Sequence, residues 1–256
     1  MNFIEDSDRY FLIIDQGNTL TKVALFKETE LQCIKHYETF TKKEITDFFN
    51  DLPVSKEIIT AGIICSVAEG EIHVTDFIPE IKWLLFDEFT RLPVTNSYSS
   101  KSTLGKDRIS GVIAAANLFP ERNVLVIDAG TAITYDIITS EGEYKGGSIS
   151  PGISMRFRAL NNFTGRLPLL KPEVPKALTG TDTNTSILTG VMNGALFEAV
   201  GFINKYESEF DNLITLITGG DVKYFDRIIK SNIFAHQNLV LSGLNLILIY
   251  NLEKNN

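Results

Sequence analysis

The sequence predicts an α/β protein made of two similar domains. A short pattern occurs twice: residues 13–19 read Ile-Ile-Asp-Gln-Gly-Asn-Thr, and residues 126–131 read Val-Ile-Asp-Ala-Gly-Thr. Each copy ends an apolar run and is followed by a second strand-like run, at residues 22–26 and 133–138. The 256 residues accommodate two domains of about 120 to 130 each. A duplicated strand–turn–strand with Asp at the turn predicts two domains that face each other across a cleft, where a phosphate chain could be held.

The elements of the first domain follow from hydrophobic periodicity. Strands are predicted at residues 10–15, 21–26 and 31–37, a helix at 42–52, and a further β-rich run at 57–65. A later helix should begin near residue 107, because apolar residues recur there with helical spacing. This order predicts a mixed sheet with helices.

The second domain repeats the opening of the first. Strands are predicted at 123–128, 133–139 and 144–149, followed by a helix that carries Arg156 and Arg158. After an irregular segment at 167–178 come a long helix at 185–206, an apolar run at 213–217 and a buried terminal helix at 239–252. The boundary is placed near residues 120–122, which gives domains 1–120 and 121–256.

Composition limits the classes of function. The net charge of -8 argues against nucleic-acid binding, since phosphate neutralisation needs a basic face. Cys33 and Cys65 have no metal-ligand spacing, which favours free thiols in a reducing cytoplasm. The N-terminus resembles no secretion signal, and the longest apolar stretch, 239–252, is too short to span a bilayer. We expect a cytoplasmic protein without a membrane partner.

The first turn of the repeat has the parts of a phosphate and cation site. Asp15 is a carboxylate at a strand end, Gly17 lets a ligand approach the backbone, and Lys22 adds a positive charge. The alternative is a plain hairpin turn, for which Gly-Asn is common. Two copies favour function.

Asp107 precedes an apolar-periodic helix and allows two interpretations. An Asp there is most often an N-cap, worth about 1 kcal/mol. Alternatively, it is a general base, with Arg108 gripping an anionic substrate. Spacing alone favours the cap.

Glycine-rich segments suggest further binding sites. Residues 144–153 place a double Gly and Pro-Gly before a helix, which indicates either an anion site or a structural turn. Residues 218–221, Thr-Gly-Gly-Asp, could flank a flat base such as adenine. The chain contains neither a P-loop motif nor a G-x-G-x-x-G fingerprint. Gly190, Gly194 and Gly201 inside the long helix indicate either close approach of another backbone or an ordinary buried helix.

Taken together, these motifs resemble the type III pantothenate kinases of the actin, hexokinase and heat-shock ATPase superfamily. The resemblance rests on five motifs in order, nearly end to end: D-x-G-N-T-x-x-K at 15–22, G-x-D-R at 105–108, D-A-G-T-A-x-T at 128–134, G-G-x-I-x-P-G at 146–152 and T-G-G-D at 218–221. It implies two duplicated actin-like (ribonuclease H-like) domains with mixed sheets flanked by helices.

The resemblance also implies roles for individual residues. Asp107 would accept the proton of the substrate hydroxyl, which reverses the preference for a cap. Asp128 would coordinate a monovalent cation, K+ or NH4+. ATP, with Mg2+, would be bound by Asp15, Gln16, Gly17, Asn18, Thr19, Leu20, Thr21, Lys22 and Thr131. Pantothenate would be contacted by Tyr98, Gly105, Lys106, Asp107, Arg108 and Thr183.

Two departures from the family pattern bear on the substrate pocket. Lys101 stands where a Pro is expected, three residues after Tyr98, and residues 181–185 offer three Thr, of which the resemblance selects Thr183. Neither departure touches Asp15, Asp107 or Asp128.

The activity implied is ATP-dependent phosphorylation of pantothenate to 4'-phosphopantothenate, the first step of coenzyme A biosynthesis, by a homodimer. The alternatives are a kinase of the same superfamily that acts on another small acceptor, and a non-catalytic nucleotide-binding regulator. The presence of Asp15, Asp107 and Asp128 argues against the regulator.

Overall fold

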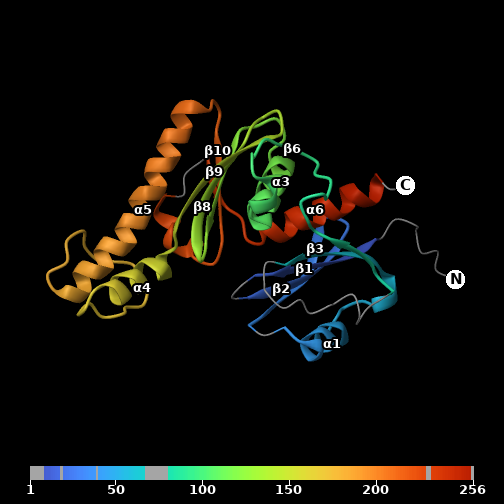
Figure 1. Cartoon of the computed structure of the whole chain (residues 1–256), viewed down its shortest axis with the longest axis horizontal. Coiled ribbons are helices and arrows are strands. Elements are labelled where there is room, and N and C mark those ends of the chain that lie inside the picture. The colour runs from blue at the N-terminus through green and yellow to red at the C-terminus, as the bar shows by residue number, and fades with distance from the viewer. Residues whose placement is uncertain (1–8, 18–19, 39, 67–79, 229–231, 255–256) are drawn as a thin grey trace. The chain divides into compact units, whose positions relative to one another are not determined.

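The computed structural model describes residues 9–17, 20–38, 40–66, 80–228 and 232–254 (Figure 1). The chain divides into two compact units. Unit 1 comprises Met1–Pro93, Ser100–Ala114 and Val240–Asn256, and unit 2 comprises Val94–Ser99 and Ala115–Leu239. Each predicted domain is one continuous stretch of the chain, whereas each of these units is assembled from separate segments.

Each unit contains one mixed sheet. The strands of unit 1 lie in the order β3-β2-β1-β4-β5, and those of unit 2 in the order β11-β10-β7-β8-β9-β6. In both, a central strand pairs antiparallel with the next strand of the chain and parallel with a later one: β1 with β2 and β4, β7 with β8 and β10. The duplication expected from the repeated motif is therefore present in the topology. The bounds are β1 Tyr10–Gln16, β2 Thr21–Lys27, β3 Glu30–Tyr37, β4 Ile59–Ser66, β5 Lys82–Leu85, β6 Thr95–Asn96, β7 Val124–Ala129, β8 Ala132–Ile138, β9 Glu143–Pro151, β10 Ile214–Thr218 and β11 Ile233–Ala235.

The predicted helices are present with small shifts at their ends. Their bounds are α1 Lys42–Asn50, α3 Lys106–Leu118, α4 Ile153–Phe163, α5 Thr183–Glu209 and α6 Leu239–Glu253. Short 3-10 segments lie at Lys56–Ile58, Lys101–Thr103, Val222–Tyr224 and Asp226–Ile228. Strands β5, β6 and β11 are not foreseen from periodicity, because each has only two to four residues.

Alternation along β1 assigns the two faces of the unit 1 sheet. Leu12 and Ile14 pack in a core cluster with Ile45 and Phe48 of α1. Asp15 follows Ile14 and points to the opposite face, since successive side chains of a strand alternate. Figure 1 shows α1 and α6 on opposite sides of this sheet.

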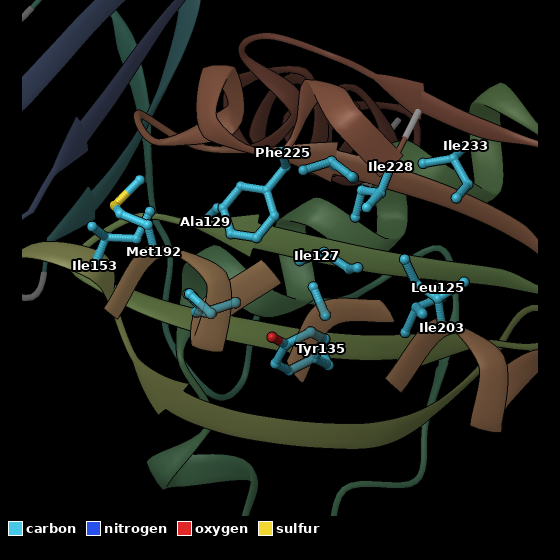
Figure 2. Packing of buried hydrophobic residues seen from close by; sticks show 14 of the residues in the cluster. Leu125, Ile127, Ala129, Tyr135, Ile153, Met192, Ile203, Phe225, Ile228 and Ile233 are labelled. Atoms are coloured by element: carbon cyan, nitrogen blue, oxygen red, sulfur yellow. The ribbon is translucent and has the colours of Figure 1, made fainter. Parts of the chain in front are cut away.

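The core of unit 2 lies between its sheet and the helices α4 and α5. Figure 2 shows Leu125 and Ile127 of β7 with Tyr135 of β8 and Ile203 of α5 in one apolar cluster. The ring of Tyr135 stacks on Phe202, with 4.1 Å between ring centroids. Because alternate residues of β7 face this core, Asp128 faces away from it.

Helix α5 has one buried face and one bare face. Its buried residues, among them Ala195 and Ala199, belong to the unit 2 core. Apart from the neighbouring backbone of α5 itself, no atom in the described part of the chain lies within 4 Å of a β-carbon added at Gly190, Gly194 or Gly201. The close approach of another backbone is therefore not made by the described residues of this chain. By length and composition alone, α5 is also the one helix among them that could cross a membrane, although it packs here as a core helix.

Candidate active site

The first phosphate-loop motif places Asp15 at the carboxyl end of β1. In the sheet, Asp15 pairs in register with Lys22 on β2 and with Cys65 on β4. Residues in register on neighbouring strands point to the same face. The carboxylate, the ammonium group and the thiol therefore form one row across the sheet.

Burial gives Asp15 unusual electrostatics. Removal from water raises the pKa of its carboxyl group to about 6, against an ordinary value of 3.8. The charge of Lys22 acts to lower this pKa, and the negative charge of Asp107 acts to raise it. Asp15 and Asp107 are thus close enough to interact, although 92 positions separate them in the sequence. The fold of unit 1 brings them together. A cation or a positively charged group between two such carboxylates would relieve their repulsion.

Asp107 lies in the first turn of α3 and is not its N-cap. The backbone carbonyl of Gly105 accepts the first helical hydrogen bond, from the N–H of Ile109 at 3.3 Å, so Gly105 holds the cap position. The carboxylate of Asp107 accepts the N–H of Arg108 at 2.8 Å. The cap interpretation is therefore wrong in detail: Asp107 turns back over the start of the helix from the second helical residue.

Lys106 joins this group from the residue before Asp107. Its Nζ donates to the backbone carbonyl of Ser66, at the end of β4, over 3.4 Å. Ser66 in turn donates from Oγ to Oε1 of Gln16 at 3.2 Å. These bonds tie the start of α3 to the carboxyl ends of β1 and β4, so they bring Gln16 and Lys106 into the same part of unit 1.

Cys65 lies beneath the same carboxylates as a buried, inert thiol. Burial raises its pKa above the usual range, and the charges of Asp15 and Asp107 act in the same direction, while Lys106 opposes them. A thiol that stays protonated is a poor nucleophile and a poor metal ligand. The free state predicted for both cysteines is observed.

The turn after β1 is only partly described. The N–H of Gly17 donates to the carbonyl of Leu20 at 3.1 Å, which closes the turn, and Thr21 begins β2 with its side chain buried. The predicted ATP contacts Asn18 and Thr19 lie outside the described residues. Arg108, on α3, is 7% exposed, so its side chain is largely buried.

In unit 2, Tyr98 is held by an aromatic stack. Its ring lies over Tyr144, with 6.1 Å between centroids, and 3.2 Å from the place of a β-carbon at Gly146. Gly146 has φ +101°, a conformation that glycine adopts freely. Tyr144 donates from its hydroxyl to the buried Asp136 at 2.7 Å. Tyr98 thus rests on a rigid base.

Asp128 is the next-to-last residue of β7, as Asp15 is of β1. It pairs in register with Thr134 on β8 and Thr218 on β10. The following residue, Gly219, has φ +98°, and a β-carbon there would overlap Asp128 Oδ1 and the carbonyl of Ala129. This glycine lets the β10 loop close over the carboxylate. The arrangement gathers oxygen atoms, the donor type that alkali cations take.

Thr131 and Gly152 connect the second turn to the start of α4. The N–H of Gly152 donates to the carbonyl of Thr131 at 3.2 Å, and a β-carbon at Gly152 would overlap the carbonyls of Gly130 and Thr131. The side chain of Thr131 is exposed on this turn. The Pro-Gly segment thus serves first as a structural turn that holds the loop carrying Thr131.

Arg156 is engaged within unit 2. It donates to Ser150 Oγ and to the carbonyl of Pro151, both at 2.8 Å, and to Glu198 of α5 at 2.7 Å. Tyr135 donates its hydroxyl to the other oxygen of Glu198 at 3.0 Å. The network fastens the β9–α4 junction to α5.

Thr183 is the first residue of α5 and is exposed. Asp182 caps the helix by accepting the N–H of Thr185 at 2.9 Å, and Thr185 Oγ1 accepts the N–H groups of Thr181 and Asp182. Thr185 is therefore occupied by the cap. Of the three threonines, Thr183 carries no such capping bond.

Comparison with known proteins assigns the family. The model of the type III pantothenate kinase family matches residues 11–205. Type III pantothenate kinases from Christiangramia forsetii and Bacteroides fragilis are 42% and 43% identical over 241 residues, and each alignment covers 94% of this chain and 98% of the relative. The chain belongs to the type III pantothenate kinase family. The resemblance expected from five motifs is confirmed.

The fold is also shared with more distant proteins. The activator of the 2-hydroxyisocaproyl-CoA dehydratase from Clostridium difficile, solved with bound ADPNP, has a TM-score of 0.57 and 11% identity, with 96% of each chain covered. At this identity the similarity shows the fold alone. It agrees with the predicted actin-like class of duplicated mixed sheets flanked by helices.

Within unit 1, the structure brings together Asp15, Gln16, Lys22, Lys106 and Asp107. Asp128, Thr131, Tyr98 and Thr183 belong to unit 2. The described residues hold no cluster of three or more His, Cys, Asp or Glu side chains that could bind a metal. Mg2+ usually takes only one or two carboxylates and completes its shell with phosphates and water, so a single Asp15 fits that pattern.

Sequence reasoning missed the Glu198 network, because no motif signals it. Glu198 lies on the interior side of a long apolar helix. The only sequence feature that could have indicated the network is this single acidic residue among apolar neighbours.

Proposed function

We propose that this chain transfers the γ-phosphate of ATP to the primary hydroxyl of pantothenate, which yields 4'-phosphopantothenate and starts coenzyme A biosynthesis. Membership of the type III pantothenate kinase family supports the reaction. The observation that carries the proposal for the site is that hydrogen bonds tie the start of α3 to the carboxyl ends of β1 and β4, where the charges of Asp107 and Asp15 act on each other. Phosphoryl transfer asks the protein mainly for positioning and charge neutralisation, with a carboxylate near the attacking oxygen.

Asp107 is proposed as the acceptor of the hydroxyl proton. Its carboxylate already accepts one backbone N–H and keeps further lone pairs, so it can take a proton from a substrate hydroxyl within hydrogen-bond reach. Gly105, Lys106, Arg108, Tyr98 and Thr183 are proposed pantothenate contacts. The stacked Tyr98 and enclosed Arg108 are preorganised side chains, as a specific small-molecule site needs.

The ATP site is proposed to use the first turn, from Asp15 to Lys22, together with Thr131. Kinases of this family imply ATP with Mg2+, and the ion would supply charge neutralisation for the phosphates. Asp15 would help hold it, and the ammonium group of Lys22 lies in register with that carboxylate. A bound cation would also lower the raised pKa of Asp15.

Asp128 is proposed to hold a monovalent cation, K+ or NH4+. The carboxylate and the carbonyl of Ala129 both lie against Gly219, so hard oxygen donors gather there. Hard oxygens suit cations that are not transition metals.

A homodimer is proposed through the bare face of α5. Gly190, Gly194, Phe197 and Gly201 recur at three- and four-residue spacing and so share one face. Phe197 is 57% exposed there, and the glycines leave room for a second backbone. Residues 1–120 and 121–256 remain the proposed N-terminal and C-terminal actin-like domains, and a cytoplasmic location remains the expectation, with no nucleic acid or membrane as partner.

The test is the Asp107→Asn variant, assayed by pantothenate-dependent ADP formation. We expect turnover to fall by at least about 100-fold, because general-base catalysis contributes about 10²–10⁴. ADP binding, followed by calorimetry, should stay within twofold. Near-normal turnover would remove Asp107 from the base role. Absence of turnover in the unsubstituted protein with pantothenate, but turnover with another acceptor, would overturn the choice of substrate.

A further inference from the structure

The duplicated topology allows the two sheets to be compared position by position. In unit 1, the N–H of Phe86 donates to the carbonyl of Ile64 at 2.9 Å, which extends the β4–β5 ladder by one residue. In unit 2, the N–H of His236 donates to the carbonyl of Ile217 at 2.9 Å and extends the β10–β11 ladder in the same way. His236 is thus the counterpart of Phe86.

The two positions differ in chemistry. Phe86 is buried, and its apolar ring needs no hydrogen-bonding partner. His236 is half-buried, and its Nδ1 is a buried atom that makes no hydrogen bond within the described part of the chain. Leaving a buried polar atom unpaired is unfavourable, so such an atom calls for an explanation. Rotation about the Cβ–Cγ bond of histidine is soft, so a modest turn of the ring can present this nitrogen to a ligand.

The register shows which residues share a face with His236. Asp128 pairs with Thr134 and Thr218, and the ladder bond places His236 beside Thr218. One polar row therefore crosses β8, β7, β10 and β11 at the ends of the three parallel strands. Ile127, Ile217 and Ile233 alternate with this row and face the α5 core instead, as Figure 2 shows for Ile127 and Ile233.

The strand order places the proposed ATP contact near one end of this row and His236 at the other. The turn between β7 and β8 carries Thr131, the proposed ATP contact. The Gly219-Gly220 pair follows β10, and Gly220 has open space where a β-carbon would stand. His236 lies one strand further, about 5 Å from β10 and about 10 Å from β7. A nucleotide with its phosphates at the β7–β8 turn and its base beside the Gly219-Gly220 pair would bring its nucleoside toward β11.

We infer that His236 donates or accepts a hydrogen bond with the nucleoside half of ATP. Phe86, at the equivalent position of unit 1, cannot make such a bond, so this contact distinguishes the sheet of unit 2 from that of unit 1. The inference rests on the proposed function in that it takes ATP as the ligand. Asp128 and Thr131 serve the cation and the phosphates, while His236 serves the sugar or the base. His236 contributes to nucleotide affinity and takes no part in proton transfer.

The matched variant is His236→Phe, because the duplicated position of unit 1 already accommodates a buried phenyl ring. It removes the ring nitrogens and keeps the ring. The loss of one hydrogen bond should raise the Kd for ADP and the KM for ATP about 3- to 10-fold. The KM for pantothenate and kcat should stay within twofold. His236→Asn and His236→Gln, which place an amide near one or the other ring nitrogen, should between them include one variant with near-normal affinity.

Ligand analogues locate the contact. If His236 contacts the ribose 2'-hydroxyl, the difference in nucleotide KM between the unsubstituted protein and the His236→Phe variant should vanish with dATP. If His236 contacts the 6-amino group of adenine, that difference should vanish with ITP. Persistence with both analogues assigns another atom of the sugar or base. Inhibition by inorganic tripolyphosphate should be equal for the two proteins.

Two results would overturn the inference: a Phe variant that binds ADP as tightly as the unsubstituted protein, or one that loses tripolyphosphate affinity to the same extent as ADP affinity. Thermal unfolding of each variant is compared to exclude a folding defect. ADP binding is measured without pantothenate. Failure of pantothenate phosphorylation therefore counts against the proposed function and leaves the test of His236 intact.

Discussion

In the first turn of α3, the carboxylate of Asp107 occupies space that a side chain at Gly105 would need. A β-carbon on Gly105 would lie 2.5 Å from Asp107 Oδ1, well inside contact distance. The same carboxylate accepts the N–H of Arg108, while Gly105 caps the helix with its carbonyl. The missing side chain at position 105 thus determines where the proposed base points.

Gly105→Ala should therefore lower kcat without unfolding the protein. The added methyl group forces the Asp107 carboxylate to move, and a displacement of about 1 Å at a reacting group can cost about 100-fold in rate. We expect kcat to fall about 10- to 100-fold while the KM for ATP stays within threefold, measured by steady-state kinetics. Gly165→Ala is the control, because nothing lies within 4 Å of a β-carbon there. Unchanged kcat in Gly105→Ala would contradict the positioning role.

Asp15→Asn should stabilise the metal-free protein while it abolishes transfer. The folded-state pKa of Asp15, about 6, exceeds its ordinary value of 3.8, so ionised Asp15 lowers the free energy of unfolding above pH 6. This penalty shrinks as the pH falls from about 6 to about 4, because the folded protein then takes up the proton first. Urea denaturation in EDTA should show a gain of about 1–3 kcal/mol at pH 8 and almost none at pH 4. The exposed Asp226→Asn should change neither value. Equal stability of Asp15→Asn and the unsubstituted protein at pH 8 would contradict the buried charge.

Glu198→Gln should destabilise unit 2 in a pH-dependent way. Partial burial acts to raise the pKa of Glu198, but hydrogen bonds from Arg156, Ser150 and Tyr135 outweigh it, so the pKa lies below its usual value of 4.5. The stabilisation is present above pH 4.5 and is lost as the pH falls through the lowered pKa. Denaturation at pH 7 should show a loss of about 1–3 kcal/mol, since a partly buried charged hydrogen bond is broken.

Glu209→Gln on the same helix is the control for Glu198. Its pair with Lys205 is an exposed i,i+4 contact, and such pairs contribute about 0.3–0.5 kcal/mol. The Arg156→Lys and Glu198→Gln double variant should cost less than the sum of the single changes, because the two side chains share one interaction. Additive costs would show that they do not act together.

Gly243→Ala should loosen the contact between α6 and α3. A β-carbon at Gly243 would overlap the backbone carbonyl of Ser110, which is fully buried in α3. Because backbone cannot move aside as a flexible side chain does, we expect a loss of about 1–3 kcal/mol in urea denaturation. Ser242→Ala, one residue earlier and half-buried, should stay within about 0.5 kcal/mol. A Gly243→Ala protein as stable as the unsubstituted one would show that the two helices can separate freely.

The central strands and the long helices could be predicted from the sequence because their periodicity is local. Strand β6 could not, since two residues pair with β9 only after the intervening chain has folded. The position of Asp107 in a helical turn could be predicted from the sequence. The orientation of its carboxylate depends on the absence of a side chain at Gly105 and on the N–H of Arg108. The place of α6 in unit 1 depends on contacts such as that of Asn245, which donates to the carbonyl of Glu28 at 2.7 Å.

That last contact has a consequence for synthesis. Unit 1 is built from the beginning and the end of the chain, and Val240–Asn256 completes it. All the residues of unit 2 are synthesised before Val240–Asn256, so the side of the unit 1 sheet that α6 covers is the last part of the molecule to be completed. A ribosome that stalls before residue 240 would therefore expose the apolar surface that later receives Leu241, Leu244 and Leu248, and would make the nascent first unit a target for chaperones.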